Sequence, residues 1–116
     1  MSEREYKFFL QDIVDDIERI KKFVSQLDKL EDLANNDLVL YAVLKAFENI
    51  GEATKHIPQH IKEKYPYFWK EVSGLRDVIV HHYWGVDMEV IYDIIENEID
   101  ELQKLTREIL EKEFSK

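Results

Sequence analysis

The chain contains no cysteine, only three glycines and two prolines, and no apolar run as long as a membrane span. The absence of cysteine excludes disulfide scaffolds, thiolate zinc sites, cysteine-ligated iron–sulfur clusters and cysteine nucleophiles. So few glycines and prolines argue against turn-rich β architectures and against phosphate-binding glycine loops. A membrane helix needs about 20 consecutive, mostly apolar residues. We therefore expect a soluble, cytoplasmic protein with no membrane segment.

Charged and apolar residues are abundant instead. They make up 35% and 45% of the 116 residues, which is a length typical of one domain. The composition predicts a single all-α domain over residues 1–116. The net charge of −9 disfavours contact with nucleic acid, but residues 45–83 hold six Lys or Arg against five Asp or Glu, and all four histidines. This middle third is where we expect an anionic ligand to bind.

Apolar residues recur at intervals of three and four along most of the chain, which is the period of amphipathic helices. The first such stripe predicts a helix of roughly 30 residues; its members are Tyr6, Leu10, Ile13, Ile17, Ile20, Val24 and Leu27. The later predicted helices run from the Asn35–Asp37 cluster to near Pro58, over Gln59–Tyr65, from Pro66 to about His82, and from Asp87 to Phe114. Together they predict an antiparallel up-and-down bundle of four main helices plus a short one.

Three further apolar residues, Phe9, Val14 and Phe23, widen the stripe of the first predicted helix. One neighbouring helix would not cover so broad a face. We therefore expect a second contact there, which another copy of the chain could supply.

A metal site is the first chemistry to consider, because helical bundles often hold metals through Glu-x-x-His pairs. No Glu or Asp here precedes a histidine by three residues. His56 and His60 have the spacing of a ligand pair, but Pro58 should end the helix between them. Glu48, Glu52 and His56 share a helical face without a partner motif elsewhere. We expect no metal.

The most unusual segment runs from Gly74 to Gly85 and carries Arg76, Asp77 and His81. A guanidinium stays charged and forks onto phosphate oxygens, and an imidazole can move protons near neutral pH. Together these groups are a minimal set for cleaving a phosphodiester. They lie about 140° apart around a helix, so both reach one ligand only near a helix end or across a subunit boundary. The alternative is a surface pair of Arg76 and Asp77 beside a half-buried histidine.

This segment also resembles a known family. The spacing Arg76-x4-His81-x-Tyr83 is similar to the Arg-x4-His-x-Tyr motif of HepT-like toxins in the HEPN superfamily. The other matching stretches are Ile50-Gly51-Glu52-Ala53, Trp69, Gly74-Leu75 and Tyr83-Trp84-Gly85-Val86-Asp87. This ordered combination is far more specific than Arg-x4-His alone.

The resemblance implies a homodimer in which two motifs meet in one cleft and cleave RNA without a metal or other cofactor. It implies Arg76 and His81 as the catalytic residues, with Asp77 and Glu52 in supporting roles. Asp77 stands where the family often has asparagine, and Glu52 is alternatively a helix-packing residue. The resemblance also implies a cognate minimal nucleotidyltransferase antitoxin, which neutralises the toxin by adding AMP to Tyr83.

A second interpretation is that the chain is a non-catalytic module that binds a nucleotide or a partner and serves a nucleotidyltransferase. In that case Arg76 and His81 bind phosphate but do no chemistry. The acidic net charge favours this alternative, because a nuclease with such a surface needs a focused basic cleft.

Overall fold

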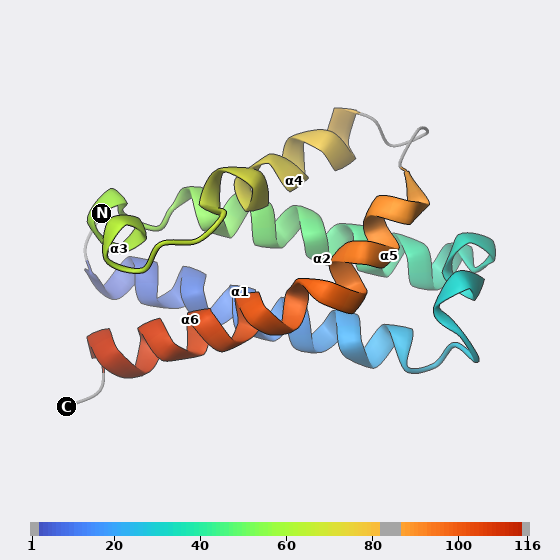
Figure 1. The fold of residues 1–116 in the computed structure, drawn as a ribbon, viewed down its shortest axis with the longest axis horizontal. Helices are drawn as coiled ribbons and strands as arrows, with labels where there is room; N and C mark the ends of the chain where they lie inside the picture. Colours follow the sequence, from blue (N-terminus) through green and yellow to red (C-terminus); the bar gives the residue numbers. More distant parts are fainter. Residues whose placement is uncertain (1–2, 82–86, 115–116) are drawn as a thin grey trace.

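The computed structural model describes residues 3–81 and 87–114, with side chains for residues 5–75 and 87–114. All regular elements in these ranges are helical (Figure 1). They are α1 (Glu3–Val24), the 3₁₀ helix η1 (Leu30–Asn35), α2 (Asp37–Lys55), α3 (Gln59–Lys64), α4 (Trp69–His81), α5 (Met88–Asn97) and α6 (Ile99–Phe114). The predicted all-α class is confirmed.

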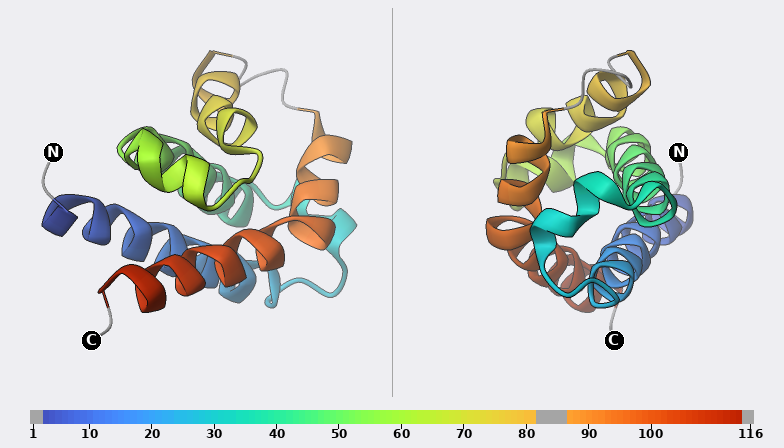
Figure 2. Two further views of the ribbon diagram at one scale, coloured as in Figure 1. Left: turned by 60° about the vertical axis from the view of Figure 1, so that its left-hand side comes forward. Right: turned by 90° about the vertical axis from the view of Figure 1, so that its right-hand side faces the viewer.

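The long helices alternate in direction. α2 runs antiparallel to α1, α4 returns along α2, and α6 runs back along α1 (Figure 1). Two further views show α4 and α5 at the periphery of this arrangement (Figure 2). The molecule is elongated, with principal extents of 44 × 27 × 20 Å. No helix within the described ranges is long and apolar enough to cross a membrane.

Local sequence signals set the predicted helix boundaries. The side chain of Asn36 accepts a hydrogen bond from the backbone N–H of Val39 and so caps α2. Asp87 caps α5 in the same way, by accepting from the N–H of Glu89 at 3.0 Å. Pro58 stands at the N-cap of the short helix α3, as its fixed φ allows.

The apolar stripe of α1 forms the centre of the core. Its first five predicted members are buried and Val24 and Leu27 are partly buried against them. The buried five are Tyr6, Leu10, Ile13, Ile17 and Ile20. From α2, Val43, Phe47 and Ile50 complete this layer. Each such side chain contributes about 1.5–3 kcal/mol through the apolar surface that it removes from water.

The wide stripe of α1 has a different cause from the one expected. Val14 is only 6% exposed within a single chain, because α6 packs on the side of α1 that α2 leaves open. Phe23 packs partly buried against the same core, and Phe9 stacks on His56 with ring centroids 4.3 Å apart. The expected second contact is therefore present, but for Val14 it is made by α6 of the same chain rather than by another copy.

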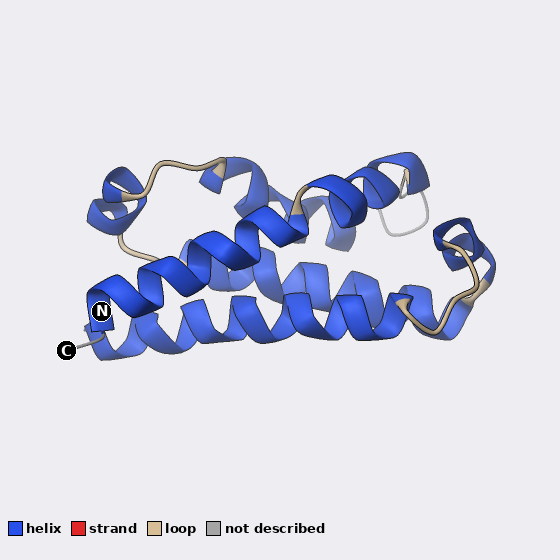
Figure 3. Ribbon diagram, turned by 60° about the horizontal axis from the view of Figure 1, so that its bottom comes forward, coloured by secondary structure: helices blue, strands red, loops and turns tan. Residues whose placement is uncertain are grey.

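Three helix boundaries also differ from the prediction. α4 begins at Trp69 rather than at Pro66. α1 ends at Val24 rather than near residue 30, and the hydroxyl of Ser25 donates to the carbonyl of Lys22 at 2.6 Å in the turn that follows. The predicted last helix is broken at Glu98 into α5 and α6. Figure 3 shows the short loop between these two helices. The break lets α5 reach η1, where the phenol of Tyr92 donates to the carbonyl of Glu31 at 3.1 Å.

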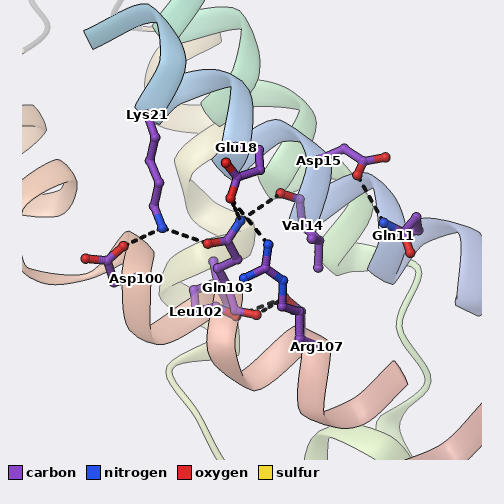
Figure 4. A network of polar contacts seen from close by, with 10 residues as sticks. Gln11, Val14, Asp15, Glu18, Lys21, Asp100, Leu102, Gln103 and Arg107 are labelled. Carbon is purple, nitrogen blue, oxygen red and sulfur yellow. Dashed lines mark hydrogen bonds and ion pairs between the residues drawn. The ribbon is translucent and has the colours of Figure 1, made fainter. Parts of the chain in front are cut away.

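A polar network fastens α6 to α1 (Figure 4). Gln103 is 2% exposed, and its Nε2 donates to the carbonyl of Val14 at 3.2 Å and to Oε1 of Glu18 at 2.9 Å. Its Oε1 accepts from Nζ of Lys21 at 2.7 Å, and Lys21 also pairs with Asp100. Because every polar atom of this buried amide has a partner, its burial carries little penalty and fixes the register of the two helices.

Candidate functional site on helix α4

Helix α4 carries the candidate residues Arg76, Asp77 and His81 in its second half. It packs chiefly on α2 and runs antiparallel to it (Figure 1). The side chains of these three residues and the whole of Tyr83 lie outside the described part of the chain. The structure establishes the helical backbone on which Arg76, Asp77 and His81 lie. It also shows the side chains and surroundings of the first half of α4.

The helical register of α4 fixes how its positions relate. Because α4 is helical from Trp69 to His81, positions 76 and 81 lie about 140° apart around its axis. Positions 77 and 81 are one turn apart on one face. Positions 76 and 81 therefore lie on different faces of α4, whereas position 77 lies on the same face as position 81.

The start of α4 is anchored by a corner at Tyr65. The indole Nε1–H of Trp69 donates to the carbonyl of Tyr65 at 2.9 Å, and the phenol of Tyr65 donates to Oε2 of Glu113 at 2.6 Å. Nζ of Lys64 lies 2.8 Å from the same carboxylate oxygen. The hydrogen bond to Glu113 raises the pKa of Tyr65 to about 12. The helix that carries the motif is thus tied to the end of α6.

Beyond this corner α4 stands away from the last two helices. An apolar hollow of about 100 Å³ lies between them, with Phe47 and Val72 among its lining residues on one side and Ile94 and Ile99 on the other. Gly74 faces open space, since among the described residues no atom apart from its chain neighbours and the backbone of α4 itself lies within 4 Å of the point where a Cβ would stand.

Glu52 lies near the end of α2, whereas His81 ends a helix that runs the opposite way (Figure 1). Its side chain is exposed, and Oε1 lies 3.6 Å from Nε2 of His56. It lines an open hollow of about 350 Å³ between α1 and α2; the other lining residues are Phe9, Asp12, Asp16, Arg19, Asn49 and Ala53. Within one chain, Glu52 faces α1 and lies toward the other end of α4 from His81.

The hollow around Glu52 is acidic. Burial raises the pKa of Asp12, and the neighbouring charge of Asp15 raises it further. Burial also raises the pKa of Asp16, although Arg19 pairs with its carboxylate at 3.0 Å. Such a surface repels the phosphates of a nucleic acid. Across the described ranges, no three His, Asp or Glu residues gather in a way that could hold a metal ion.

A second open hollow, which the motif analysis did not single out, lies between α3 and the start of α4. It has a volume of about 520 Å³. Its lining residues are Gln59, Lys62, Glu63, Pro66, Tyr67, Trp69, Lys70 and Ser73. The only sequence signal for it was the positive balance of residues 45–83, which did not indicate which lysines come together.

Comparisons with known proteins agree on one family. A family model described as ribonuclease HepT-like matches residues 13–109. "Putative RNase MJ0125" of Methanocaldococcus jannaschii is 40% identical over 111 residues, which cover 95% of each chain. "Probable ribonuclease HepT" of Thermococcus cleftensis is 36% identical over 101 residues, 86% of this chain and 91% of that one. No solved structure matches the chain. By its sequence over nearly its whole length, the chain belongs to the HepT-like ribonuclease family.

Proposed function

We propose that this protein is the toxin of a toxin–antitoxin pair and that it cleaves RNA as a homodimer without a metal ion. The observation that carries the proposal is the sequence spacing of Arg76, His81 and Tyr83, the first two of which lie on α4, in a chain that belongs to the HepT-like ribonuclease family. Two relatives with names that describe RNases cover almost the full chain.

The register of α4 supports a site built from two chains. Positions 76 and 81 diverge by about 140° on one helix, so they cannot both face one phosphate from the middle of a straight helix. In a dimer with two motifs side by side, Arg76 of one copy and His81 of the other act on the same phosphate. A composite cleft also concentrates positive charge on a chain of net charge −9.

In the proposed reaction the ribose 2′-oxygen attacks the adjacent phosphorus and the 5′-oxygen leaves. His81 removes the 2′-proton or protonates the leaving oxygen, and Arg76 stabilises the charge of the phosphorane. The products are a 2′,3′-cyclic phosphate and a 5′-hydroxyl. RNA is required because DNA lacks the attacking hydroxyl.

The proposed antitoxin is a minimal nucleotidyltransferase that modifies Tyr83. The phenol oxygen attacks the α-phosphate of ATP, pyrophosphate leaves, and AMP remains on the tyrosine. The bound AMP adds bulk and negative charge two residues from His81, where the RNA backbone must lie.

The test measures cleavage of single-stranded RNA and growth arrest on induced expression. We expect cleavage that persists in EDTA, is lost on a 2′-deoxy strand, and falls by at least about 100-fold in Arg76→Ala and His81→Ala. His60→Ala, which removes an exposed histidine on α3, is the matched control and should stay active. Strict dependence on magnesium would overturn the proposed mechanism.

The net charge favours a second candidate function, that of a non-catalytic nucleotide- or partner-binding module for the nucleotidyltransferase. For such a module, wild type and both variants are equally harmless on expression and none of them cleaves RNA. The same experiment therefore separates the two functions.

A further inference from the structure

The open hollow between α3 and α4 is lined by two lysines from different helices. Lys62 comes from α3 and is half-buried, and Lys70 comes from the first turn of α4 and is exposed. Trp69, which is buried and donates a hydrogen bond to the carbonyl of Tyr65, also lines the hollow. Both lysines therefore extend from helices that meet at the anchored corner where the motif helix begins.

Neither lysine has an ion-pair partner in the described part of the chain, although Lys64, two residues from Lys62, pairs with Glu113 at 2.8 Å. Glu63 lines the same hollow, but among these described side chains it makes no ion pair with either lysine. Burial lowers the pKa of Lys62, because its ammonium loses water without gaining a counter-charge. An anion placed in the hollow would supply that missing counter-charge.

From this hollow, one stripe of positions on α4 leads toward the motif. Positions 70, 73, 77 and 81 follow the helical intervals of three and four, so they form one stripe of this helix. Lys70 and Ser73, at its start, line the hollow, and His81 ends it. Eleven residues at 1.5 Å per residue separate Lys70 from His81, which is about 16 Å. At about 3.4 Å per stacked nucleotide, a single strand covers that distance with roughly five nucleotides.

We propose that Lys62 and Lys70, with the hydroxyl of Ser73, bind backbone phosphates of the substrate RNA a few nucleotides to one side of the cleaved bond. This inference rests on the proposed ribonuclease function and adds a binding site for the strand. Lysine acts as a point charge on phosphate and reads no base. The site therefore contributes affinity and the minimum length of the substrate, with no sequence preference. RNA is favoured over an acidic protein partner because the hollow lies on the same stripe of α4 as His81.

The test compares the double variant Lys62→Gln/Lys70→Gln with wild type. A labelled 2′-O-methyl RNA strand, which cannot be cleaved, reports binding by fluorescence anisotropy at several salt concentrations. We expect the Kd to rise roughly tenfold and the slope of log K against log salt to fall by about 1.4, or 0.7 for each lost phosphate contact on a single strand. Lys22→Gln/Lys29→Gln removes the same charge from two exposed lysines elsewhere and should keep the Kd within about twofold.

Cleavage supplies the second readout. On a long RNA the double variant should raise KM with little change in kcat, because the lysines do not touch the reacting phosphate. On a dinucleotide, too short to reach the hollow, it should equal wild type. Lys62→Arg/Lys70→Arg, which keeps both charges, should retain tight binding.

Each other outcome overturns a defined part of the argument. If the glutamine variant binds RNA like the control while wild type cleaves in a His81-dependent way, the phosphate site is wrong and the ribonuclease function stands. If the variant keeps RNA binding but loses the nucleotidyltransferase, the hollow is a protein-docking surface instead. A wild-type protein that neither binds nor cleaves RNA overturns both proposals.

Discussion

The phenol of Tyr65 donates a 2.6 Å hydrogen bond to Oε2 of Glu113, across 48 positions of the sequence. This contact joins the corner before α4 to the last turns of α6. The same carboxylate pairs with Lys64, and the carbonyl of Tyr65 accepts from Trp69. The end of the last helix thus holds the start of the helix that carries Arg76 and His81.

Replacing Tyr65 with phenylalanine removes this hydrogen bond and leaves the ring in place. We expect the free energy of unfolding to fall by about 1–2 kcal/mol, because the bond is made to a charged group. Chemical denaturation measures the change. Tyr92→Phe is the control, since that phenol donates to a backbone carbonyl at an exposed position. Equal losses of unfolding free energy in the two variants would show that the hydrogen bond to Glu113 stabilises the fold no more than one at an exposed position.

The same contact predicts how stability depends on pH. The hydrogen bonds from Lys64 and Tyr65 lower the pKa of Glu113 from its usual 4.5. The folded state therefore binds a proton at Glu113 less tightly than the unfolded state does. The stability that the ionised Glu113 contributes is complete above about pH 4.5 and is lost as the pH falls through the pKa of the folded state. We expect thermal stability to fall less steeply in acid for Glu113→Gln than for wild type. If the stability of wild type and of Glu113→Gln falls equally steeply in acid, Glu113 does not cause this pH dependence.

The alkaline side offers an independent check. The pKa of Tyr65 is raised from 10.0 to about 12. The stability that the protonated phenol of Tyr65 contributes is then complete below about pH 10 and is lost as the pH rises toward about 12. Wild type should lose more stability than Tyr65→Phe over this interval, as measured by unfolding followed with circular dichroism.

Gly74 lies inside α4, and within the described part of the chain there is open space where a Cβ would be. Alanine is favoured over glycine in a helix interior by about 1 kcal/mol. Gly74→Ala should therefore raise the melting temperature. A lower melting temperature would mean that a second chain approaches this part of α4 closely and leaves no room for a methyl group.

The composite cleft predicts a dimer. Sedimentation at micromolar concentration should give about 28 kDa, twice the 14.0 kDa of the chain. Leu38 on α2, 82% exposed in the single chain, offers apolar surface for such a contact. A stable monomer that still cleaves RNA would rule out a cleft shared between two copies.

Tyr83 tests the proposed control by the antitoxin. With ATP, the partner nucleotidyltransferase should add AMP to wild type, and peptide mass spectrometry should map it to Tyr83. We expect Tyr83→Phe to remain toxic when the antitoxin is co-expressed, and Tyr92→Phe to be neutralised like wild type. Full neutralisation of Tyr83→Phe would show that the antitoxin inhibits by binding alone.

Local patterns in the sequence determined most of the helices. The spacing of apolar residues on α1 identified the side chains that are buried, and Asn36, Pro58 and Asp87 marked helix starts that the structure confirms. These signals suffice because helix period and capping depend on residues within one or two turns. The motif spacing likewise pointed to α4 and to the family before any fold was known.

Tertiary packing decided the rest. Nothing local marks the break at Glu98, where neither glycine nor proline stands, because it follows from α5 covering η1 while α6 follows α1. The sequence indicated that Val14 needs a second packing contact, but only the fold shows that α6 supplies it. Lys62 and Lys70 line one hollow because α3 and α4 meet at the corner around Tyr65, which is hydrogen-bonded to Glu113. Such contacts join residues far apart in the chain, and only the fold brings them together.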